Sequence, residues 1–233
     1  MKDFLYAIGF KRMKNWTRSG LLEETFKILR ELNMGDRVLS IGGYGATDSA
    51  LERTCLDLGL TLTKLDVEKS HNPDILADIS DINLLIDAKF NAVVALEVLE
   101  HIPFYELAIT NIHGLLAESG SLVLSTPWII PVHDKPGDYH RFTHFELNRS
   151  LRDRFEVKIG FRGNYLDSIF VLGLRGLISG GLTGKCVFML TYFLTFFRKP
   201  PVINFTNLVD IPDSTIGYFV SGKKRINADR RKS

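Results

Sequence analysis

The feature that most constrains the fold is a short apolar segment that runs directly into a cluster of glycines. Residues 37–41 read RVLSI, and Gly42, Gly43 and Gly45 follow within four positions. A run with helical character then covers residues 49–58. Glycines at such a turn let the backbone pass close to a ligand, and the free N–H groups at a helix start point toward it. This order predicts a strand, a tight turn and a helix that together face a ligand.

A second strand-like segment ends in an acid shortly after this turn. Residues 60–65 read LTLTKL, and Asp66 follows them. In a βαβ unit, an acid at the tip of the second strand, about 20 residues after the glycines, can accept hydrogen bonds from ribose hydroxyls. The glycine turn and Asp66 together predict a site for a nucleoside-containing cofactor.

Strand-like and helix-like segments alternate along the rest of the chain. We expect strands at 74–79, 90–96, 121–127, 155–161 and 215–221, helices at 105–116 and 145–151, and a small helix or turn at 84–88. Gly120 is expected to stop the first of these helices, and Thr143 and Glu146 have the spacing of a capping box at the start of the second. Residues 1–34 predict a helical cap over one sheet face. The alternation predicts an α/β fold with a parallel, helix-flanked sheet.

Length and composition exclude several classes of protein. A chain of 233 residues fits one large domain, and a net charge of +2 is too small to indicate a nucleic-acid partner. Cys55 and Cys186 are far apart, so the sequence predicts neither a disulfide framework nor a zinc site, and it fits a reducing, cytoplasmic setting without a signal peptide. Basic residues cluster at both ends, which indicates either solvated termini or contact with anionic lipid head groups.

The segment after residue 127 is irregular and carries several candidate catalytic side chains. Open α/β sheets place substrate sites in loops after the carboxyl ends of their strands. His133 and His140 lie in this loop and have the intrinsic pKa range of a general base, and Asp138 could orient either one. Arg141 is expected to anchor a substrate anion or the loop itself.

An apolar insertion is expected at about residues 165–212. Its second half, residues 186–197, is apolar almost throughout and is bracketed by Lys185 and by Arg198 with Lys199. This run is shorter than the roughly 20 residues that a bilayer-spanning helix needs. Three interpretations remain open, namely a helix in the membrane interface, a wall around an apolar substrate, and a core helix.

Further motifs resemble those of class I S-adenosylmethionine-dependent methyltransferases. The segment 90–103, FNAVVALEVLEHIP, is the most specific match, and 115–127, LLAESGSLVLSTP, resembles the helix, turn and strand that follow it. The resemblance covers roughly residues 35–160 and the strand near Tyr218. The loop 131–143, PVHDKPGDYHRFT, is similar to a loop in a subset of these enzymes linked to glycan or lipid modification. The resemblance implies a Rossmann-like, seven-stranded, mostly parallel sheet with an antiparallel last strand, formed by residues 35–233.

The resemblance also implies S-adenosylmethionine as the cofactor and a set of residues that bind it. Asp66 would bind the ribose, while Asp78 and Ile79 would contact the adenine. The remaining expected cofactor-binding residues are Ser40, Gly42, Gly43, Gly45 and Glu97. Two positions depart from the pattern, because the family usually has Asp or Glu where Ser40 stands and often has glycine where Tyr44 stands.

Glu97, Glu100 and His101 allow two interpretations. On a helix that starts near Glu97 they would share one face and could hold a divalent cation together with His133 or another histidine, as in some related methyltransferases. The favoured interpretation has no metal, with Glu97 near the cofactor and the other two fixing the loop.

The leading functional hypothesis is therefore methyl transfer to a small-molecule, lipid-linked or glycan acceptor, with possible peripheral membrane contact and no nucleic acid. The alternatives are a non-catalytic partner protein with this fold, which the departures at Ser40 and Tyr44 motivate, and a nicotinamide-dependent oxidoreductase. The oxidoreductase is disfavoured because the full G-x-G-x-x-G fingerprint is missing.

Overall fold

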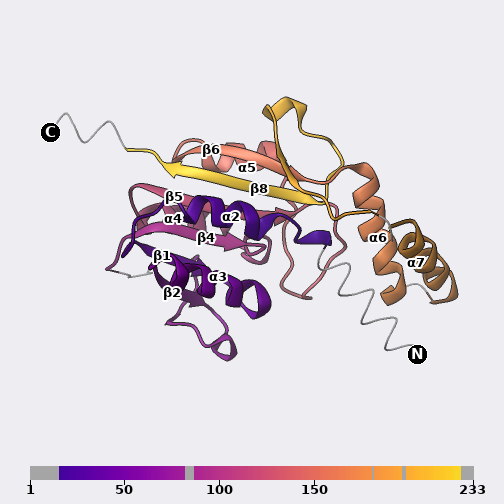
Figure 1. Cartoon of the computed structure of the whole chain (residues 1–233), viewed down its shortest axis with the longest axis horizontal. Helices are drawn as coiled ribbons and strands as arrows, with labels where there is room; N and C mark the ends of the chain where they lie inside the picture. Colours follow the sequence, from indigo (N-terminus) through magenta and orange to yellow (C-terminus); the bar gives the residue numbers. More distant parts are fainter. Residues whose placement is uncertain (1–15, 82–86, 180, 196–197, 227–233) are drawn as a thin grey trace.

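One mixed sheet forms the centre of the molecule. The computed structural model describes residues 16–81, 87–179, 181–195 and 198–226, and its eight strands have the order β3-β2-β1-β4-β5-β8-β6-β7 (Figure 1). The strands are β1 (Arg37–Ile41), β2 (Thr61–Asp66), β3 (Ile75–Leu76), β4 (Phe90–Leu96), β5 (Leu116–Pro127), β6 (Phe155–Arg162), β7 (Ile203–Phe205) and β8 (Gly217–Lys224). The helices are α2 (Leu21–Leu29), α3 (Gly45–Asp57), α4 (Tyr105–Leu115), α5 (His144–Leu151), α6 (Tyr165–Ser179) and α7 (Gly181–Thr195), with 3₁₀ turns η1 (Lys69–His71), η2 (Leu99–His101) and η3 (Leu208–Asp210).

The sheet has a parallel half and an antiparallel half. Strands β3, β2, β1, β4 and β5 pair in parallel, whereas β8 pairs antiparallel with both β5 and β6. This confirms the expected α/β fold with an antiparallel last strand. The sheet has eight strands, however, because β7 forms inside the expected insertion and pairs antiparallel with the end of β6. Only Ile203 of its three residues is buried, so the segment has too little alternation to be recognised from sequence.

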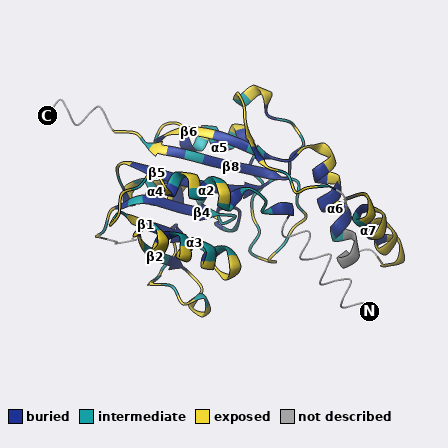
Figure 2. Cartoon of the chain, in the orientation of Figure 1, coloured by how far each residue is buried: buried dark blue, intermediate teal, exposed yellow. Residues whose placement is uncertain are grey.

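Helices cover both faces of the sheet, as Figures 1 and 2 show. Helices α2 and α3 share one core with the inward side chains of β1 and β4, such as Val38 and Val94, while α4 and α5 pack on the opposite face against residues such as Leu39 and Val93. Neighbouring residues of β1 and β4 thus enter different cores, which explains the continuous apolar pattern of β4. The packing of α2 agrees with the expected cover of a sheet face.

Several element boundaries differ from those expected. Helix α3 begins at Gly45, four residues early, and β3 covers only two of the six expected residues. Strand β5 begins directly after α4, so the residues before Gly120 are extended and do not form a helix end and turn. The expected element at 84–88 and the first fifteen residues of the expected cap lie largely outside the described residues.

Helices α6 and α7 form a hairpin beside the sheet (Figure 1). Helix α6 is fixed to the body by Phe170 and Val171, which share a small core with Trp16 and Ile216. Gly173 allows the close approach of α7, because a Cβ at this position would overlap the side chain of Thr191. Within the described part of the chain, no helix combines the length and the apolar content that crossing a membrane requires.

Candidate functional site

A cavity of about 940 Å³ lies at the carboxyl ends of β1, β2 and β4. It lies where the strand order reverses between β1 and β4, which is the usual ligand site of open α/β sheets. The expected residues that line it are Ser40, Gly42, Gly43, Asp66, Asp78, Ile79, Glu97 and His133. The expected residues that do not line it are Gly45, Asp138 and His140.

The glycine turn is shaped by crowding as well as by backbone conformation. Gly42 and Gly45 have φ angles of 64° and 69°, which side-chain-bearing residues rarely adopt. A Cβ on Gly43 would lie 2.6 Å from Asp48 Oδ1 and 2.7 Å from Ser40 Oγ. The turn therefore brings the Ser40 hydroxyl and the Asp48 carboxylate together against a bare stretch of backbone.

Tyr44 lies at the rim of the cavity and does not fill it. Its side chain is 54% exposed, and its ring stacks on His71 with 4.4 Å between centroids and 2° between planes. His71 also approaches Asp66, with 2.8 Å between Nδ1 and Oδ2, while Asp66 Oδ1 accepts a hydrogen bond from the Glu68 amide. Asp66 is thus fixed at the tip of β2 on the cavity wall. The part of His71 was not identified from sequence, because it depends on the turn η1.

Asp48 is a second acid on this wall that the sequence did not identify. It is 6% exposed, and its Oδ1 has no hydrogen-bond partner among the described residues. Lys64 Nζ lies 3.6 Å from Oδ2. Burial raises the pKa of Asp48, and the charge of Lys64 partly opposes this. Asp48 Oδ1 and Ser40 Oγ both lie close to Gly43. Ser40 occupies the position where the family pattern has an acid, so Asp48 brings a carboxylate to the same place.

Glu97 is held by a buried arginine from a distant strand. It follows β4 with a φ of 57°, and its Oε1 accepts hydrogen bonds of 2.8 Å each from Ser125 Oγ and Arg162 Nη2. Arg162, at the end of β6, is fully buried and also donates to the carbonyls of Thr126 and Thr17. Sequence reasoning missed Arg162, since nothing local links two residues 65 positions apart.

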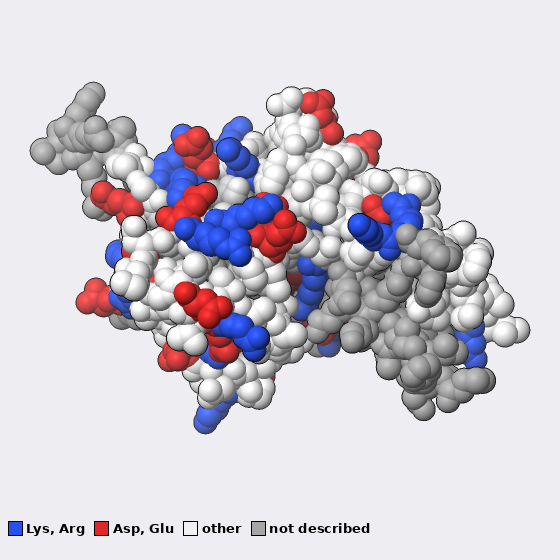
Figure 3. All heavy atoms as spheres, viewed as in Figure 1, with Lys and Arg blue, Asp and Glu red and all other residues white. Residues whose placement is uncertain are grey.

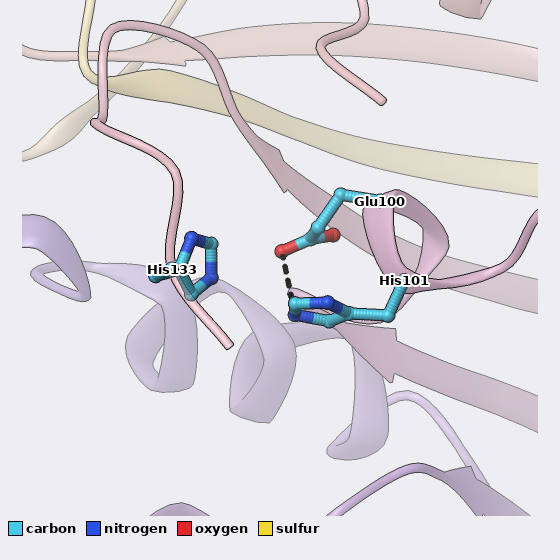
Figure 4. A group of neighbouring side chains, drawn as sticks. All are labelled: Glu100, His101 and His133. Atoms are coloured by element: carbon cyan, nitrogen blue, oxygen red, sulfur yellow. Dashed lines mark ion pairs between the residues drawn. The ribbon is translucent and has the colours of Figure 1, made fainter. Parts of the chain in front are cut away.

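Glu100, His101 and His133 form a group beside the cavity, in which the two histidines line the cavity and Glu100 is buried behind its surface (Figure 4). No helix starts near Glu97, because Glu100 and His101 lie on the 3₁₀ turn η2 and His133 comes from the loop after β5. One ligand atom from each of the three lies within 4.8 Å of the others. Burial and the charge of Glu97 raise the pKa of Glu100 well above its ordinary value, and burial lowers the pKa of His133.

The loop after β5 is anchored by Asp138 and Arg141. Arg141 donates two hydrogen bonds to the Asp138 carboxylate, of 2.5 and 2.7 Å. It therefore anchors the loop, which is one of the two roles expected for it. Burial alone would raise the pKa of Asp138, but the hydrogen bonds from Arg141 and the His133 amide lower it to about 2. Asp138 Oδ2 lies 3.2 Å from His133 Nδ1. His140 instead packs on Tyr105, and Asp138 is therefore placed to orient His133 and not His140.

Comparisons with known proteins give one family and a large set of similar folds. A family model described as a methyltransferase domain matches residues 14–157, more than half of the chain. A SAM-dependent methyltransferase from Archaeoglobus fulgidus is 16% identical with a TM-score of 0.53, covering 92% of this chain and 100% of that one. Phosphoethanolamine N-methyltransferase 2 from Haemonchus contortus, solved with S-adenosyl-L-methionine, is 11% identical with a TM-score of 0.55, covering 92% and 56%. The [4+2]-cyclase SpnF is 16% identical with a TM-score of 0.55, covering 87% and 81%. A search of curated proteins finds no match.

Proposed function

The chain belongs to the methyltransferase-domain family, and on that premise we propose that it transfers a methyl group from S-adenosylmethionine to a small-molecule, lipid-linked or glycan acceptor. The observation that carries this proposal is the cavity at the tips of β1, β2 and β4, with Asp66 at one end and His133 at the other. The bound cofactor supplies a sulfonium methyl group, and the protein has mainly to align an acceptor with it and exclude water.

The cavity residues fit the cofactor on two counts. The bare backbone at Gly43 leaves space where any side chain would overlap its neighbours. The free Oδ1 of Asp48 gives a buried partner for the positively charged amino group of the methionine moiety, which compensates for the missing acid at Ser40. Asp66 would bind the ribose hydroxyls, and Asp78 with Ile79 would contact the adenine.

The acceptor is proposed to bind at the end of the cavity under the loop after β5. Burial keeps His133 neutral near pH 7, so its imidazole can accept a proton from a hydroxyl or an amine. Asp138 Oδ2 accepts a hydrogen bond from the His133 backbone amide and lies 3.2 Å from Nδ1 of the ring, and Arg141 fixes Asp138. Because His140 packs away from the cavity lining, we assign it no step in the transfer.

The exposed hairpin α6–α7 favours an acceptor with an apolar part and supports peripheral membrane contact. Leu182, Leu190 and Phe193 are 79%, 61% and 69% exposed, and Lys185 lies on the same helix. Arg198 follows this helix and pairs with Asp167. On the face in Figure 3, most described atoms at this end of the molecule are uncharged, with a few Lys or Arg side chains among them. Arg175 of α6 lines the cavity, so the hairpin continues from the cavity wall to the surface. Apolar helices with basic flanks bind anionic membrane interfaces.

Calorimetric titration separates the candidate functions. We expect S-adenosylmethionine to bind and NADH not to bind. Binding of NADH alone would support an oxidoreductase, and binding of neither would support a non-catalytic partner protein. Incubation with labelled-methyl cofactor and fractionated extracts then identifies the acceptor, and an extract without any labelled product would contradict the proposed transfer.

Vesicle flotation tests the membrane contact. The full chain should float with anionic vesicles, and Leu190→Asp should reduce the floated fraction. Leu56→Asp is the matched control, because Leu56 is equally apolar and 79% exposed but lies on α3. Equal flotation of both variants and the parent chain would remove the assignment to the hairpin.

A further inference from the structure

Glu100 is a buried carboxylate whose oxygens accept no hydrogen bond in the described structure, and its one ion-pair contact, with His101 Nε2, is long at 3.8 Å. Its side chain is fully buried, and neither oxygen receives a hydrogen bond from another described residue. Its neighbour Glu97, by contrast, is paired with Arg162. Burying a charged group without a partner is costly, and proteins normally avoid it by pairing the group, protonating it or using it to bind a metal. The position of Glu100 thus requires an explanation.

Two imidazoles lie beside Glu100, and one nitrogen of each ring lies within 4.8 Å of a Glu100 carboxylate oxygen. Nδ1 of His101 lies 2.6 Å from the carbonyl oxygen of Gly137, and Nδ1 of His133 lies 3.2 Å from Asp138 Oδ2, although this second ring is not aligned for a straight hydrogen bond. An oxygen acceptor at Nδ1 places the ring proton there and leaves the lone pair on Nε2. Nε2 of His101 is 3.8 Å from Glu100 Oε1. The His101 ring thus presents Nε2 to Glu100, while its Nδ1 contacts the loop that contains Gly137.

We propose that Glu100, His101 and His133 bind a divalent first-row transition ion. Metal-binding histidines typically donate the other ring N–H to a carboxylate or a backbone carbonyl. The Gly137 carbonyl provides this acceptor for His101, and the Asp138 carboxylate lies 3.2 Å from His133 Nδ1. Two imidazoles and one carboxylate oxygen suit Zn²⁺, Co²⁺ or Fe²⁺ better than Mg²⁺, which prefers oxygen ligands alone. Three protein ligands leave at least one position open, as in catalytic sites. Glu97 is not part of this site, because Arg162 and Ser125 hold its carboxylate.

The ion also specifies the acceptor class, an inference that rests on the proposed function. His101 and His133 both line the cavity, so the open position faces the space for the acceptor. A hydroxyl or phenol that binds there releases its proton to solvent at lower pH, because the cation stabilises the oxyanion. The oxygen lone pair then forms the bond to the methyl carbon, and the electrons of the broken S–CH₃ bond remain on sulfur as a neutral thioether. With the ion bound, it is the ion and not His133 that activates the acceptor. The site therefore selects an acceptor oxygen over an amine nitrogen.

Cobalt binding tests the site without any methyl transfer. Co²⁺ titrated into the full chain, in the absence of S-adenosylmethionine, should give visible absorption bands typical of low-coordinate nitrogen and oxygen ligation. Loss of an outer-shell partner already weakens metal sites roughly 10- to 100-fold. Glu100→Gln and His133→Asn, which each remove a direct ligand, should therefore weaken binding by more than about 100-fold. His113→Gln is the matched control, because His113 packs on Phe155 outside the cavity. Absence of the bands, or unchanged titrations in both variants, would overturn the proposal.

Two further measurements keep the interpretations separate. Thermal unfolding shows whether Glu100→Gln folds, and His133→Asn provides a second test at a partly exposed loop position. Calorimetric titration of S-adenosylmethionine in the presence of a chelator should give the same affinity as without it. If S-adenosylmethionine does not bind while Co²⁺ still binds, the proposed function fails and the metal site stands. If S-adenosylmethionine binds but Co²⁺ does not, only the metal site fails.

Discussion

The two ends of the cavity differ in how their acidic side chains are held. At the end formed by β2 and the following turn, which we call the nucleoside end, Asp66 and Asp78 each accept hydrogen bonds from residues within five positions in sequence. At the end formed by η2 and the loop after β5, which we call the loop end, Glu100 and His133 meet across 33 positions and Glu100 has unpartnered oxygens. The nucleoside end is thus preorganised by local turns, whereas the loop end is assembled by the tertiary fold.

This difference indicates distinct roles. A carboxylate that local backbone groups already fix can bind the same ligand part with little rearrangement, which suits a cofactor. A carboxylate whose buried oxygens lack partners is set to interact with a group that arrives later, such as a cation or an acceptor. Glu97 is held by its pair with Arg162, and its charge still acts on Glu100, because it raises the pKa of that carboxyl.

The largest expected effect comes from breaking the pair between Glu97 and Arg162. Arg162→Met should lower the free energy of unfolding by about 3 kcal/mol or more, because it leaves Glu97 buried without its partner. Chemical denaturation measures this change. Arg149→Met is the matched control, since its pair with Glu146 is at the surface and should contribute little to stability. Similar losses of unfolding free energy in both variants would mean that burial does not make the Arg162 pair more important than a surface pair.

At the nucleoside end, Asp66→Ala should weaken S-adenosylmethionine binding. Loss of hydrogen bonds to a charged group costs about 1.5–3 kcal/mol, which corresponds to roughly 10- to 150-fold in affinity. Calorimetric titration measures the change, with Asp57→Ala at the end of α3 as the control. An unchanged affinity would remove the ribose assignment and, with it, one side of the comparison.

The loop end should respond to acid through Asp138. Its folded pKa of about 2 is below its ordinary value of 3.8, so its stabilisation is present above the ordinary value and is lost as the pH falls toward 2. The stability difference between the parent chain and Asp138→Asn should be about 2 kcal/mol near neutral pH and should shrink below about pH 4. Denaturation at several pH values checks this. A difference that is independent of pH would show that the Asp138 charge does not anchor the loop.

The smallest expected effect concerns Asp48 at the nucleoside end of the cavity. Its Oδ1 has no hydrogen-bond partner among the described residues. Asp48→Asn should weaken S-adenosylmethionine binding by about tenfold, since one charge-assisted contact is lost. Ser40→Asp in the same chain should restore most of this affinity, because the two side chains converge on Gly43. Binding of 5′-methylthioadenosine, which lacks the amino-acid part, should stay unchanged. Equal weakening for both ligands would mean that Asp48 acts only on the turn geometry.

The sequence predicted the parts of the site that are close together along the chain. Gly42, Gly43, Asp66, Asp78 and Ile79 all line the cavity, because the carboxyl ends of neighbouring parallel strands meet at one sheet edge. It could not predict the strand β7, whose three residues carry almost no pattern. It also placed His140 among the catalytic candidates, because two loop histidines that differ in packing look alike in sequence.

The sequence by itself determined the α/β class and the cofactor edge, since strand periodicity, glycine turns and strand-end acids act within short stretches of chain. Only the tertiary structure decided that Arg162 neutralises Glu97 and that no hydrogen bond from another described residue reaches the Glu100 oxygens. It also decided that Asp48 faces Ser40 and that His133, not His140, reaches the cavity. The physical reason is that burial and charge pairing depend on which distant segments pack together, and no local pattern of residues contains that information.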